Sequence, residues 1–188
     1  TNLAGLLSHN TFETLSIDTD KISGRADSCN PTLQNNFFQK TIVTKVFKIP
    51  TEARNTPTAL VVRSGNLFVT LDSSTSSDSD LMILRIINEG FELVSEIHNG
   101  PGFLSERLVG DILFVGNSSV TNQLLVYHVG NPNYPTLVSS LKLSPPSDEQ
   151  TVGFQIAYQK NILILGLKKT VGAELRLIDV SNISNPRE

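Results

Sequence analysis

The 188-residue chain contains one cysteine, Cys29, and no tryptophan. A single cysteine excludes any disulfide within the chain. An excess of charge of one sign is also missing, since 15 Lys and Arg stand against 18 Asp and Glu without a long block of either. Nucleic acid and anionic membrane surfaces are therefore poor default partners. No apolar run approaches the roughly 18 residues that a membrane-spanning helix needs.

The residues that are plentiful favour β-strands. Val, Ile, Leu, Thr and Ser dominate, and the apolar residues come in runs of four to eight bounded by Asn, Asp, Gly, Pro and Ser. This is the pattern of strands and turns. No window shows a sustained helical stripe with a period of about 3.6 residues. We therefore expect an all-β protein.

One unit recurs three times. After a first strand and a tight turn, its second strand begins at Leu67 ("LFVT"), Leu113 ("LFVG") and Leu163 ("LILG"), at intervals of 46 and 50 residues. A polar loop and a third strand follow in each copy: "LMILRI", "LLVYHV" and "LRLIDV". A turn and a further strand come next in the first two copies. Four antiparallel strands per repeat at this period predict the blades of a β-propeller, as part of a larger propeller.

The repeat divides the chain into expected segments. Residues 1–40 form a polar lead-in without a copy of the unit, and a cap, a linker and a loop excursion are all open interpretations. A partial propeller over 41–188 follows. Its expected parts are the last strand of an upstream blade (41–49), two blades (58–97 and 105–143) and an incomplete blade (152–188). Because propellers close with about four to eight blades, we expect the remaining blades, or another subunit, to complete the fold.

The third copy, "LRLIDVSNISNP" at residues 175–186, resembles the signature of the LVIVD repeat family. "LLVYHVGNPNYPTLV" at 124–138 is a diverged copy, and "LRIINEGFELV" at 84–94 is a weak one without the prolines. The resemblance covers about residues 58–188. It implies a secreted or cell-surface propeller, commonly bacterial or archaeal, that binds other molecules. It supplies no catalytic residues and no cofactor. The absence of tryptophan also counts against the WD, PQQ and sialidase Asp-box propellers, whose repeats use it.

Three polar residues occupy one repeat position: Arg85, His128 and Asp179. The signature aspartate is kept only as Asp179. All three should project from the same face of the third strand in their blades. A metal or catalytic ring would repeat one chemistry, so this variety predicts a solvated face.

The loop "DSSTSSDSD" contains candidate ligands for calcium. Asp72, Asp78 and Asp80 lie close together there, and Ca²⁺ takes six to eight oxygen ligands. The loop lacks the order of an EF-hand, however, and Ser/Asp runs are common at hairpin tips. No other metal or cofactor is expected.

The expected inner strands carry Arg63, Glu106, Arg107 and Asp111, the residue types that enzymes on propeller scaffolds use. No recurring acid–base set accompanies them. Three functions therefore stay open: a non-catalytic platform that binds a protein or glycan, a hydrolase that acts on a glycan or peptide, and a structural subunit of a surface filament or layer. The first is favoured, so we assign no catalytic residue.

The last expectation concerns packing. Phe68, Phe114 and Ile164 occupy equivalent positions in the second strand of each unit, which is apolar on both faces. We expect all three side chains to pack between neighbouring sheets.

Overall fold

The computed structural model describes residues 56–73, 75, 77–88, 90–143, 151–168 and 173–188. The lead-in predicted at 1–40, which includes Cys29, and the strand predicted at 41–49 lie outside the described residues.

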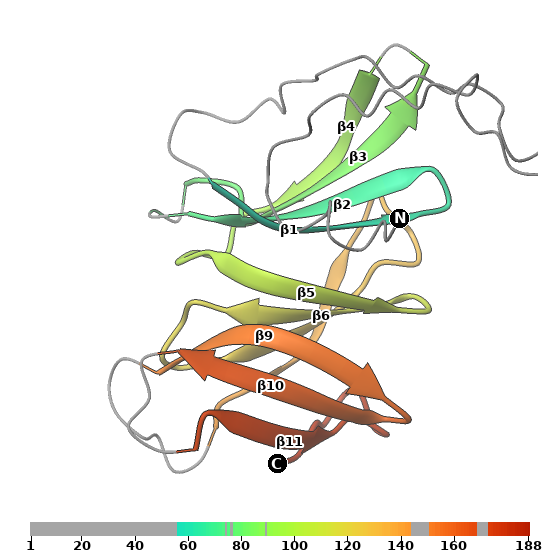
Figure 1. The fold of residues 1–188 in the computed structure, drawn as a ribbon. Helices are drawn as coiled ribbons and strands as arrows, with labels where there is room; N and C mark the ends of the chain where they lie inside the picture. Colours follow the sequence, from blue (N-terminus) through green and yellow to red (C-terminus); the bar gives the residue numbers. More distant parts are fainter. Residues whose placement is uncertain (1–55, 74, 76, 89, 144–150, 169–172) are drawn as a thin grey trace, which may run out of the picture. The chain divides into compact units, whose positions relative to one another are not determined.

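The described residues form three antiparallel sheets and no helix, so the predicted all-β class is confirmed (Figure 1). Within each sheet, every strand pairs with its neighbour in the chain. Sheet A consists of β1 (Thr56–Arg63), β2 (Asn66–Asp72), β3 (Leu81–Ile87) and β4 (Gly90–Ile97). Sheet B consists of β5 (Phe103–Val109), β6 (Ile112–Asn117), β7 (Leu124–His128) and β8 (Thr136–Leu141). Sheet C consists of β9 (Val152–Gln159), β10 (Ile162–Lys168) and β11 (Leu175–Asp179).

This arrangement is consistent with propeller-like blades, and the three described sheets do not close a ring. Sheets A and B each contain the four strands expected of a blade. In sheet C, the chain turns after β11 and makes one isolated bridge back to it, between Asp179 and Arg187. The same place in sheet B is the pair His128–Thr136, where β8 begins. Arg187 therefore stands where a fourth strand starts.

Two irregularities recur in the sheets. The inner strands β1, β5 and β9 each carry one extra residue relative to their partners: Thr58, Leu104 and Phe154. The fourth strands β4 and β8 carry another, at Val94 and Val138. Extra residues of this kind are β-bulges, which bend a strand and increase its twist. The units therefore share details of backbone geometry as well as strand order.

The turns between the first two strands of sheets A and C share one conformation. Ser64 and Gly65 have φ angles of 49° and 76°, and Lys160 and Asn161 have φ angles of 47° and 66°. Two consecutive positive φ angles characterise the type I′ turn, whose twist matches the twist of the flanking strands. Asn and Gly adopt this conformation at low cost, which explains the turn chemistry of "SG" and "KN".

Each sheet has two faces, which we name by the neighbouring sheet along the chain. The following face is the one on the side of the next sheet, and it carries Phe68 in sheet A, Phe114 in sheet B and Ile164 in sheet C. The preceding face carries the adjacent leucines, Leu67, Leu113 and Leu163. The register places partners of one pair on the same face: Phe68 with Ile83, Phe114 with Val126, and Ile164 with Leu177.

The sheets pack in sequence, the following face of one against the preceding face of the next. One core joins Phe68 and Ile83 of sheet A to Leu113 and Val115 of sheet B. A second core joins Phe114 of sheet B to sheet C. Its other fully buried members include Val126, Leu163, Leu165 and Ile178.

The packing expectation is therefore correct for two of the three equivalent positions. Phe68 and Phe114 are each 2% exposed and lie between sheets. The expectation is wrong for Ile164, which is 37% exposed. Its face, the following face of sheet C, has no further described sheet against it, so an apolar side chain at the same register position stays in contact with solvent.

Candidate functional site

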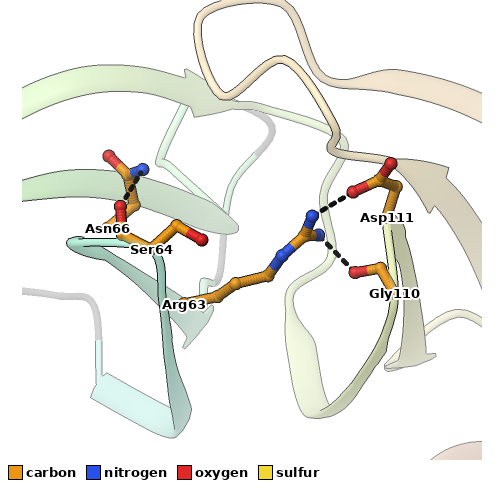
Figure 2. A network of polar contacts seen from close by, with 5 residues as sticks. All are labelled: Arg63, Ser64, Asn66, Gly110 and Asp111. Atoms are coloured by element: carbon orange, nitrogen blue, oxygen red, sulfur yellow. Dashed lines mark hydrogen bonds and ion pairs between the residues drawn. The ribbon is translucent and has the colours of Figure 1, made fainter.

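Arg63, at the end of β1, links sheet A to sheet B. Its guanidinium donates hydrogen bonds to the Gly110 carbonyl oxygen and to the Asp111 carboxylate, both in the turn between β5 and β6 (Figure 2). The planar guanidinium can serve two acceptors at once. This turn places Asp111 outside the inner strand in which the sequence predicted it. Arg63 and Asp111 are thus brought together, but as a clamp between two hairpins.

The clamp also determines the ionisation of Asp111. The hydrogen bond and the positive charge of Arg63 lower the pKa of this exposed carboxyl, and His128 adds a smaller effect in the same direction. An exposed carboxylate that is held ionised by an arginine is a poor proton donor. The pair stabilises an edge between sheets and offers no general acid.

Asp80 has a structural role that the sequence did not reveal. Its side chain is fully buried and accepts hydrogen bonds from the Ser73 hydroxyl and from the backbone amides of Asn99 and Gly100. These two amides belong to the segment that leads from sheet A to sheet B. The pKa of Tyr127 in sheet B is raised mainly by the burial of its own hydroxyl, and the nearby negative charge of Asp80 raises it further. Asp80 therefore anchors the connection between two sheets.

Gln123 does the same for the next connection. It is 2% exposed, its Oε1 accepts from the Leu143 amide at 3.1 Å, and its Nε2 donates to the Thr151 carbonyl oxygen at 3.1 Å. The backbone carbonyls of Asp80 and Gln123 occupy equivalent places, since they accept from Leu71 and Asn117 respectively. Glu174 follows as the third, accepting from Leu167. The sequence signal was available: each residue directly precedes the leucine that opens the third strand.

A pair of serines was also missed. Ser95 on β4 donates to the Pro132 carbonyl oxygen in the turn of sheet B, at 2.6 Å. Ser139 on β8 donates to the Ile183 carbonyl oxygen in the turn of sheet C, also at 2.6 Å. Both serines lie next to the bulged valine of the fourth strand. The recurring "LVS" in these strands could have indicated an equivalent role.

The calcium candidates occupy different environments. Asp80 uses its carboxylate on protein donors, Asp78 is partly buried and Asp72 is exposed. Within the part of the chain that the structure describes, no group of three or more His, Cys, Asp or Glu residues is placed to hold a metal ion. The loop calcium site receives no support from this geometry and stays a prediction.

Among the carboxyl groups of the described residues, Glu106 has the most strongly shifted pKa. It pairs with Val115 across β5 and β6, which places it on the preceding face of sheet B, toward sheet A. Neither carboxylate oxygen has a hydrogen-bond partner among the described residues. Burial alone raises the pKa of Glu106 to about 8. Arg107, the next residue, projects to the opposite face and is exposed, so these two candidates do not converge.

Arg85, His128 and Asp179 are exposed and equivalent, as predicted. Each pairs with the residue before the second-strand leucine: Asn66, Ile112 and Ile162. Arg85 forms an ion pair at 2.8 Å with Glu92, its partner on β4.

A pocket lies in the Asn-rich turn after β11. It measures about 230 Å³ and is lined by Asp179, Ser181, Asn182, Asn185 and Arg187. The Asp179 carboxylate accepts a hydrogen bond from the Ser181 amide. Hydrogen bonding from Ser181 lowers the pKa of Asp179, and the charge of Arg187 has a smaller effect in the same direction. Asn182 likewise accepts from the Ser184 amide at 3.1 Å. The lining side chains thus hold their own turn, as Asn131 does in sheet B by accepting from the Asn133 amide.

In the residues that the structure covers, there is no helix with the length and apolar character to cross a membrane. No family model matches the sequence, and the search of curated proteins found no match. The resemblance to LVIVD repeats therefore rests on the quoted motifs alone and stays a prediction.

Proposed function

We propose that the protein is a non-catalytic propeller scaffold that binds a protein or a glycan through its loops, outside the cell or at the cell surface. The observation that carries this proposal is the contrast between the scaffold and the loops. Bulges, serine hydrogen bonds and buried linker anchors recur from sheet to sheet. The loops before the third strands, at 73–80, 118–123 and 169–174, differ in composition, and the first is longer than the other two. A conserved frame with divergent loops is the usual division between a scaffold and a recognition surface.

One exposed aromatic side chain offers a contact point. Tyr134, in the turn between β7 and β8, is 74% exposed, although the chain has only 6% aromatic residues. Tyrosine combines a large apolar surface with a hydroxyl and is enriched at binding surfaces. The resemblance to LVIVD repeats supports the extracellular setting.

The test is a glycan array together with a panel of surface proteins, both probed with the full chain. We expect binding to at least one class, and a reduction of at least about tenfold on Tyr134→Ala, the size of effect typical of a buried interface aromatic. Leu137→Ala, an exposed residue on β8, is the matched control and should bind as wild type does. Turnover of a substrate without stable binding would contradict the proposal.

A second function, hydrolysis of a glycan or peptide bond, is favoured by one observation. A carboxyl group with a pKa near 8, such as Glu106, is protonated at neutral pH and can act as a general acid. Asp111, the other carboxylate named on the expected inner strands, is engaged by Arg63. A panel of glycosides and esters tests this alternative. Turnover that Glu106→Gln abolishes would establish it over the binding function.

A further inference from the structure

The following face of sheet C carries apolar side chains at the register positions that join the other sheets. In sheets A and B, this face presents Phe68 with Ile83 and Phe114 with Val126, and all four are buried. Sheet C presents Ile164 with Leu177. These two side chains are 37% and 63% exposed, and Leu175 beside them is 68% exposed. A contiguous apolar surface of this kind on a folded sheet marks an interaction site.

The two covered faces show what such a surface receives. Sheet A receives the preceding face of sheet B, and sheet B receives the preceding face of sheet C. Each incoming sheet presents a leucine and a second aliphatic residue two positions later on its second strand: Leu113 with Val115, and Leu163 with Leu165. Each also presents a turn carbonyl oxygen to a serine of the sheet that it covers. The partner's chemistry is therefore visible twice in this molecule.

We propose that the following face of sheet C is the docking surface for one further antiparallel sheet of this repeat, which buries Ile164, Leu175 and Leu177. The inference deepens the proposed function, because it names the partner that the scaffold itself requires. Glu174 is consistent with this assignment, since its equivalents Asp80 and Gln123 are buried by the connection to a next sheet, whereas Glu174 is exposed.

The register allows a direct test. Because Arg187 and Glu188 occupy the places of Thr136 and Leu137, a second copy of residues 138–188 can be appended after Glu188 in phase with the repeat. The appended segment supplies a fourth strand, a connection and a sheet whose preceding face already covers sheet B. A thiol is introduced at the first copy's position 164 by Ile164→Cys in a Cys29→Ser background. Its rate of alkylation is compared between the 188-residue chain and the extended chain.

We expect alkylation at position 164 to slow by at least tenfold in the extended chain. Leu177→Asp in the first copy should restore the fast rate, because a charge on this surface prevents burial. Leu60→Cys, in β1 and 59% exposed, is the control and should react equally in both chains. An unchanged rate at position 164, whether the appended segment is folded or not, would overturn the proposal. The binding function would survive that result, since it is measured on the array and depends on the loops.

Discussion

Sheets B and C have the same strand order and the same bulge in the inner strand, but different surroundings. Sheet B lies between two sheets, whereas sheet C has a described sheet on one side only. Phe114 and Ile164 show the consequence, since they hold one register position and are 2% and 37% exposed. The strand pattern determines which side chains share a face, and the neighbouring sheet determines whether that face is buried.

The polar anchors repeat this difference. Gln123 of sheet B is buried and holds the segment that leads to sheet C. Glu174 holds the equivalent backbone place in sheet C and is exposed. Asp80, at the same position in sheet A, shows that a covered carboxylate is accepted there as well when protein donors bind it.

The sharpest test of the comparison is truncation of the two equivalent side chains. Phe114→Ala should reduce the free energy of unfolding by about 3–5 kcal/mol, since the ring is buried and stacks on Tyr158 at a centroid distance of 5.9 Å. Ile164→Ala should cost less than about 1 kcal/mol, because the side chain already contacts solvent. Urea denaturation measures both values. Equal losses would contradict the difference between the two faces.

The buried carboxyl group of Glu106 should make the stability of the protein depend on pH. The pKa of Glu106 is raised from an ordinary 4.5 to about 8, so the folded state binds its proton more tightly than the unfolded state does. Stability should therefore fall as pH rises from about 4.5 to about 8. Glu106→Gln, which stays neutral, should be more stable than wild type by about 3 kcal/mol at pH 7, since about 2.5 pH units at roughly 1.4 kcal/mol each separate the two forms.

Urea midpoints at pH 4.5 and pH 8 measure this effect for both proteins. The advantage of Glu106→Gln should largely vanish at the lower pH. Glu92→Gln, at an exposed residue, should differ from wild type by less than about 1 kcal/mol at either pH. If wild type and Glu106→Gln shared the same pH profile, the burial of this carboxyl would be disproved.

Asp80→Ala probes the anchor between sheets A and B. We expect the free energy of unfolding to fall by about 2–3 kcal/mol in urea denaturation, because the amides of Asn99 and Gly100 lose a buried acceptor.

Removal of metal ions tests the same carboxylate in the wild-type chain. EDTA should leave the unfolding midpoint unchanged if the Asp80 carboxylate binds only protein donors. A midpoint that EDTA lowers and added calcium restores would instead establish the loop calcium site.

The smallest effect is expected at the exposed register position. His128→Ala should change the free energy of unfolding by less than about 0.5 kcal/mol, because the ring is exposed and makes only a small contribution to lowering the pKa of Asp111. Chemical denaturation at pH 7 measures it. A loss close to that of Phe114→Ala would mean that the ring is buried or holds a ligand.

Much of this architecture was predictable from the chain itself. Runs of four to eight apolar residues with turn residues between them indicated the strands, since local backbone preference and alternation act over a few residues. The recurring leucines at 67, 113 and 163 indicated the equivalence of the units, and the exposure of Arg85, His128 and Asp179 followed from their variety. The candidate site was less predictable. Glu106 and Arg107 were both named as residues of the expected inner strands, but adjacent residues of a strand point to opposite faces.

The sequence by itself determined the strand class, the repeat and the side chains that share each face, because these depend on local preference and on a period of two residues. Only the tertiary structure decided which faces are covered. It showed that Asp80 anchors a connection, that Arg63 clamps Asp111, and that Ile164 stays in contact with solvent where Phe114 is enclosed. The physical reason is that burial and hydrogen-bond partners arise between segments about 20 to 50 residues apart, and no local pattern encodes which segments meet.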